Sequence, residues 1–130
     1  METSATERPL FSVFMTCWLP VLLYISAILL VSAQPGLRPP PGLQLSDKAY
    51  HMMEYGGLGL LLVRALRGTF RLRLPIVAAL FAIVIGLMIG ISDECFQAFV
   101  PGRESSAFDV LADVTGLIVA QIAYLFAARE

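Results

Sequence analysis

The feature that most constrains this chain is a stretch at residues 10–33 that contains no charged side chain. A helix of this length crosses the roughly 30 Å hydrocarbon core of a bilayer. Three further apolar stretches follow, with ionisable side chains at their edges. A charged group in hydrocarbon costs at least about 2.5 kcal/mol, so these side chains need partners or a water-filled pocket. The pattern predicts a membrane protein with a polar site.

The composition agrees with this class of protein. Of 130 residues, 58% are hydrophobic and 15% are charged, and the mean hydropathy is +0.78. A soluble domain of this length has too much surface to bury several helices that are apolar all round. The net charge of −1 and the absence of a long basic block predict no nucleic-acid partner. Cys17 and Cys95 both lie inside apolar stretches, which predicts buried free thiols.

We predict an all-α fold, an integral membrane bundle of four transmembrane helices in a single domain at residues 10–130. The predicted spans are residues 10–33, 48–66, 74–99 and 106–128. Pro20 should kink the first span. Ser46 or Asp47 is the predicted N-cap of the second span. Pro75 marks the start of the third span and Pro101-Gly102 its end. Ser105 or Ser106 is the predicted N-cap of the fourth span.

The N-terminal stretch has two interpretations. Val31-Ser32-Ala33 has the small side chains of a signal-peptide cleavage site. The apolar stretch is too long for a signal peptide, however, and Glu2 and Glu7 accompany the lone Arg8, so a retained helix is favoured. The proline-rich residues 34–46 that follow should form an extended connector.

Lys and Arg residues predict the orientation, because short cytoplasmic loops carry an excess of them. With residues 1–9 and the C-terminus both cytoplasmic, the inner side carries Arg8, Arg64, Arg67, Arg71, Arg73 and Arg129, against Arg38, Lys48 and Arg103 outside. We therefore predict a multi-pass membrane protein with both termini cytoplasmic. This topology brings the ionisable ends of the second, third and fourth spans to the outer leaflet.

Helical periodicity places the ionisable groups on shared faces. On the second span this face, or stripe, carries Lys48, His51, Tyr55, Gly59 and Leu62, with Glu54 one step aside. On the third span it carries Gly86, Gly90, Glu94 and Gln97. On the fourth span it carries Asp109, Asp113, Gly116 and Ala120. Small residues four apart permit close contact between helices. The acids should therefore face partner helices and not lipid.

The ordered set of these residues resembles the VanZ-like family of membrane proteins. The resemblance rests on Trp18, Ser32-Ala33-Gln34-Pro35, Asp47-Lys48, His51, Glu54-Tyr55-Gly56, Leu58-Gly59, Glu94, Gln97, Pro101-Gly102-Arg103, Ser106, Asp109 and Gly116. Asp113 departs from it, because the family more often has Asn there, which leaves open whether the pocket is more negative or Asp113 is protonated. The resemblance implies a bacterial protein of the cytoplasmic (inner) membrane with a cell-envelope role. The family's name comes from a protein that raises tolerance to the glycopeptide teicoplanin. Fold and motif alone do not transfer that resistance.

Three roles for the polar residues are possible. In an enzyme, Glu94, Asp109 and His51 are the candidates for catalysis, with Glu54 as another possible base. The binding candidates, which would hold an envelope lipid, a wall precursor or a glycopeptide, are Lys48, Glu54, Tyr55, Gln97, Arg103 and Asp113. A protein that binds or shields such a ligand without turnover would use the same pocket. In the alternative structural role, pairs such as Lys48 with Glu94 and Arg103 with Asp109 only hold helices together.

Metal binding has little support, because His51 is the single histidine and would have to act with Glu54, Glu94 and Asp109. We expect no metal and no cofactor. A channel is disfavoured by glycines that indicate tight contact, and the oligomeric state stays open. Membrane lipids are the expected surroundings.

Overall fold

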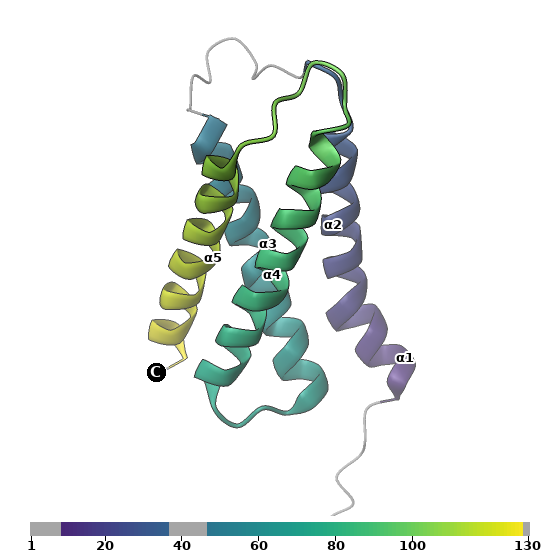
Figure 1. The fold of residues 1–130 in the computed structure, drawn as a ribbon. Coiled ribbons are helices and arrows are strands. Elements are labelled where there is room, and N and C mark those ends of the chain that lie inside the picture. The colour runs from purple at the N-terminus through teal and green to yellow at the C-terminus, as the bar shows by residue number, and fades with distance from the viewer. Residues whose placement is uncertain (1–8, 37–46, 129–130) are drawn as a thin grey trace, which may run out of the picture.

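The computed structural model describes residues 9–36 and 47–128, and its regular elements there are all helical. Their bounds are α1, Leu10–Val13; the π-helical η1, Phe14–Trp18; α2, Leu19–Ser32; α3, Asp47–Phe70; α4, Pro75–Gln97; and α5, Ala107–Ala127. α1, η1 and α2 form one continuous helix, and the helices alternate in direction along the bundle (Figure 1). The all-α prediction is confirmed over the described residues.

The π-helical turn is explained by Pro20. Proline has no N–H to donate, and its ring collides with the carbonyl group four residues earlier in a regular α-helix. Widening the preceding turn relieves this collision, and the N–H of Leu19 donates to the carbonyl of Phe14, five residues earlier. The helix changes direction between α1 and α2 (Figure 1), as the sequence predicts for this proline.

The helix ends largely follow the predicted signals. Pro75 opens α4, and the Ser106 hydroxyl caps α5 by accepting the N–H of Phe108 at 3.2 Å. α3 does not end at residue 66 but continues to Phe70, where Arg71 adopts a φ of +47°. This left-handed conformation commonly terminates a helix. The predicted cap of α3 by Ser46 lies outside the described residues.

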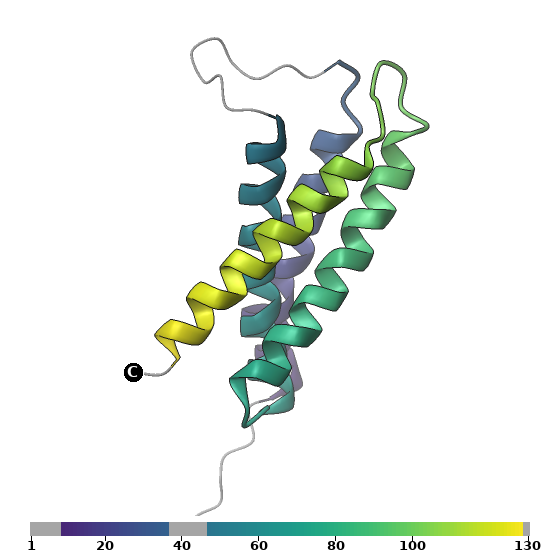
Figure 2. The same cartoon turned by 60° about the vertical axis from the view of Figure 1, so that its left-hand side comes forward.

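Three helices are long and apolar enough to cross a membrane among the described residues: Leu10–Ser32, α4 and α5. α3 does not qualify, because its first half carries Asp47, Lys48, His51 and Glu54. The predicted count of four spans is thus not confirmed. α3 instead forms the centre of the bundle and packs against α2, α4 and α5 (Figures 1 and 2).

Burial follows the predicted stripes. Tyr55, Leu58 and Leu62 of α3 are buried, whereas Leu80, Phe81, Val84 and Met88 of α4 are exposed on the outside of the bundle. An exposed apolar surface of this kind suits contact with lipid. Cys17 is buried, but Cys95 is exposed on α4, so the prediction of a buried thiol is wrong at that position.

Small residues let the helices approach. A Cβ atom on Gly116 of α5 would overlap the backbone carbonyl group of Met52 in α3, and one on Gly86 of α4 would overlap the Leu117 side chain. The predicted close contacts along these stripes are therefore present. The Gly116 contact holds the middle of α5 against the first half of α3, next to His51.

Candidate functional site

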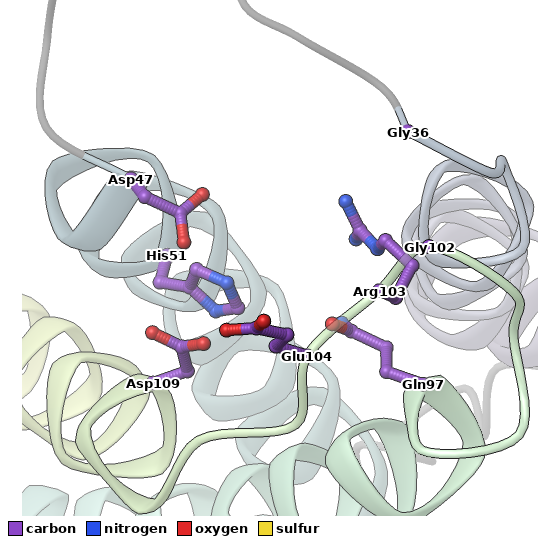
Figure 3. Close-up of a pocket in the computed structure, with 8 residues that line it drawn as sticks. All are labelled: Gly36, Asp47, His51, Gln97, Gly102, Arg103, Glu104 and Asp109. Carbon is purple, nitrogen blue, oxygen red and sulfur yellow. The ribbon is translucent and has the colours of Figure 1, made fainter.

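A polar pocket lies at the end of the bundle where α2 and α4 end and α3 and α5 begin. Its volume is about 350 Å³. Figure 3 shows carboxylates around the ring of His51, with Gln97 and Arg103 across the opening. The lining residues are Gly36, Asp47, His51, Gln97, Gly102, Arg103, Glu104 and Asp109. The lining includes four of the predicted site residues: His51, Gln97, Arg103 and Asp109.

An ion pair joins α3 to α5 beside the pocket. The Lys48 ammonium group donates to Oδ1 of Asp109, whose side chain is buried, while 44% of the lysine side chain is exposed. The predicted pairs of Lys48 with Glu94 and of Arg103 with Asp109 are not formed among the described residues. Lys48 lies near the start of α3, one turn before His51, and so reaches the beginning of α5 and not the end of α4.

A second pair lies deeper, between His51 of α3 and Asp113 of α5. Nδ1 of His51 is 2.8 Å from Oδ1 of Asp113, and both side chains are buried. The other Asp113 oxygen, Oδ2, has no hydrogen-bond partner among the described residues. Gly90 of α4 makes room for it, because a Cβ atom there would lie 3.0 Å from this oxygen.

Glu94 connects α4 to the N-terminus of α5. Its Oε2 atom accepts the backbone N–H of Ser106 at 3.0 Å, which satisfies one of the free donors at the helix start. Its Oε1 atom is buried without a partner in the described structure. Glu94 is thus only half satisfied.

A buried network that the sequence reasoning missed surrounds Asp93. Oδ2 of Asp93 accepts from Oγ of Ser32 at 2.8 Å and from Nε2 of Gln97 at 3.1 Å. This network links α2 to α4. The spacing of Asp93 and Gln97, four residues apart on one helix face, was a signal for it. Asp47 and Glu104 were likewise not predicted as pocket residues.

Two predicted binding residues lie away from the pocket lining. Glu54 is half-buried, and it is its backbone carbonyl that accepts the Tyr24 hydroxyl, at 3.0 Å. Tyr55 is fully buried in the core, and its hydroxyl has no partner among the described residues. Neither side chain reaches the pocket in this structure.

Arg103 lies in the loop between α4 and α5 and lines the pocket. Its Nε atom is buried and makes no hydrogen bond within the described ranges. No ion pair to Arg103 is present in the part of the chain that the structure describes, although Asp47, Glu104 and Asp109 line the same pocket. The guanidinium group is therefore placed to meet a ligand.

The chemistry available here is that of carboxylates, one imidazole, one amide and one guanidinium group. The histidine groups with acids in two ways: with Asp47 and Asp109 at the pocket, or with Glu94 and Asp113 below it. Glu54, which the sequence suggested as a possible ligand, belongs to neither group.

The comparison with protein families identifies the chain over most of its length. The model of the VanZ/LLP1 family matches residues 21–128. The match includes all the pocket residues and begins after Trp18, which the sequence resemblance had included. No curated protein and no solved structure matches the chain.

Proposed function

The chain belongs to the VanZ/LLP1 family, and on that premise we propose that this multi-pass membrane protein binds the polar head group of an envelope lipid or lipid-linked wall precursor. The unpaired Arg103 in the pocket is the observation that carries the proposal. Guanidinium groups bind phosphate bidentately, and Asp47, Glu104 and Asp109 can accept hydrogen bonds from sugar or glycerol hydroxyl groups. The apolar part of the ligand would lie beside Phe99 and Phe108, which are exposed.

The orientation is part of the proposal. We place α3 across the membrane as a fourth span, because it packs against α2, α4 and α5 and runs antiparallel to α2 and α4 and parallel to α5 (Figure 2). Arg64, Arg67, Arg71 and Arg73 lie at the end of the bundle opposite the pocket, which favours that end as cytoplasmic. Both termini are then cytoplasmic, and the pocket faces outward in a bacterial cytoplasmic membrane.

Cysteine labelling tests this orientation. In a chain carrying Cys17→Ser and Cys95→Ser, we expect Ser105→Cys to react with an impermeant maleimide in intact cells, since it is exposed in the α4–α5 loop. Arg73→Cys, in the α3–α4 loop, should react only after permeabilisation. The reverse pattern would place the pocket on the cytoplasmic side.

Loss of Arg103 should weaken ligand retention. We expect Arg103→Gln to reduce the lipid that co-purifies in mild detergent at least about tenfold, because a charge-assisted hydrogen bond contributes about 1.5–3 kcal/mol. Mass spectrometry of extracted lipid gives the measurement. Arg73→Gln is the matched control, since it removes the same charge from the exposed opposite end. Equal retention by wild type and both variants would contradict the proposal.

A second candidate is an enzyme that acts on the same head group. The buried His51–Asp113 pair favours it, because a carboxylate at Nδ1 orients an imidazole for acid–base chemistry at its other nitrogen. Glu94 and Asp109 are the proposed additional acids or bases. The two candidates differ in what accumulates: a binding protein yields retained lipid, whereas an enzyme yields altered lipid.

Tolerance to teicoplanin-type glycopeptides is a narrower form of the proposal. It requires that the ligand be a wall precursor or the drug itself.

The competing non-enzymatic role, in which the polar residues only hold the helices together, accounts for the Lys48–Asp109 pair and the Asp93 network. It does not account for the unpartnered atoms of Arg103, Glu94 and Asp113.

A further inference from the structure

We propose that His51, Glu94 and Asp113 form a binding site for a divalent metal cation beneath the pocket. Each residue comes from a different helix: α3, α4 and α5. Their ligand atoms all lie within 4.8 Å of one another, and all three side chains are buried. The spacing is suited to a single cation, which would join the three helices.

Unpartnered oxygens point to a ligand. Glu94 is 4% exposed and Asp113 is 1% exposed, and each has one carboxylate oxygen without a hydrogen-bond partner among the described residues. Buried polar atoms in folded proteins are nearly always satisfied by protein, water or an ion. Asp93 nearby also has one unpartnered oxygen, Oδ1, but its other oxygen accepts from Ser32 and Gln97, and Asp93 belongs to neither group of ligand atoms that lie within 4.8 Å of one another.

Charge supports the same conclusion. The two carboxylates outnumber the single imidazole, so even an ion pair between His51 and Asp113 leaves a negative charge in the bundle. Holding an uncompensated charge away from water costs several kcal/mol. A divalent cation offsets it.

The donor set indicates the kind of cation. One imidazole nitrogen with carboxylate oxygens suits Mn²⁺ or Zn²⁺, whereas sites rich in thiolates suit Cu⁺. The alternative group of Asp47, His51 and Asp109 is less suitable, because Asp109 is engaged by Lys48 and Asp47 is exposed. His51 lines the pocket from which a head group could reach an open coordination position. Only this approach of a head group to the cation rests on the proposed function; the cation site itself does not.

The test is direct metal binding to the full chain in lipid-free detergent. We expect chelator-treated wild type to bind Mn²⁺ at one site, measured by the loss of the free-ion electron paramagnetic resonance signal, and Zn²⁺ to displace it. Glu94→Gln and Asp113→Asn should each weaken Mn²⁺ binding at least about 100-fold. Loss of a residue that only hydrogen-bonds to a metal ligand already lowers metal affinity about 10- to 100-fold, and loss of a ligand should cost more. Asp93→Asn removes a neighbouring buried carboxylate but no ligand, and it should retain binding within about tenfold.

Two results would overturn the site: no saturable binding by wild type, or an equal loss in all three variants. If a ligand variant does not fold, X-ray absorption of the Zn²⁺-loaded wild type still decides. A shell of nitrogen and oxygen with imidazole scattering supports the site, and sulfur ligands from Cys17 or Cys95 refute it. The metal measurement contains no lipid, so a failure to bind Mn²⁺ leaves the lipid-retention result for Arg103→Gln unaffected. A failure of the lipid-retention experiment likewise leaves the metal result unaffected.

Discussion

Replacing Gly116 with alanine is expected to lower the free energy of unfolding by about 2–3 kcal/mol, the cost typical of overpacking. The new methyl group would overlap the carbonyl group of Met52. This atom is backbone within α3, so it cannot rotate away as the end of a side chain could. α3 and α5 would have to separate, which would also pull His51 from Asp113.

Gly56→Ala is the matched control for this crossing. Gly56 lies across the same contact, but a Cβ atom there would be 3.4 Å from the Gly116 carbonyl oxygen, an ordinary contact. We expect its stability to change by no more than about 1 kcal/mol, since alanine also favours the helix. Unfolding of both variants in increasing sodium dodecyl sulfate, followed by circular dichroism, gives the measurement. Similar stability of the two variants would show that the crossing is looser than described.

The fold was predictable because its strongest signals are local. The uncharged stretch at residues 10–33, Pro75 and Ser106 each act within one helix, and the helices begin or end close to where these signals place them. The predicted span at residues 48–66 is not confirmed, because the polar first half of α3 keeps it from being apolar enough to count as a span. The packing of α2, α4 and α5 against α3 buries His51 of this half, and which helices pack together is not revealed by any local pattern.

The candidate site was predicted in part. The glycine stripes correctly indicated that Glu94, Asp109 and Asp113 face other helices, because a small residue one turn away marks the contact face. The partners were not predictable, since which helix end meets which depends on tilt and register. Lys48 therefore meets Asp109 and not Glu94, and Tyr55 packs in the core.

The buried His51–Asp113 pair should show strong coupling in a double-mutant cycle. His51→Leu alone leaves the Asp113 carboxylate buried without its imidazole, and we expect a loss of about 3–5 kcal/mol in unfolding free energy. The double variant His51→Leu with Asp113→Ala removes both polar groups, and it should recover at least about 1 kcal/mol, within the range of coupling energies for residues in contact. Additive losses in the same unfolding assay would show that the two side chains do not interact.

The same double variant separates structure from function. If the polar residues served only to hold helices together, a variant that regains stability through apolar packing would retain its co-purified lipid and would differ from wild type in nothing else. A binding site predicts the opposite, because the restored fold lacks the imidazole that lines the pocket and the carboxylate beneath it. We therefore expect a folded, monodisperse protein that binds no Mn²⁺ and retains less lipid than wild type. Wild-type levels of both ligands in this variant would assign the buried polar groups to stability alone.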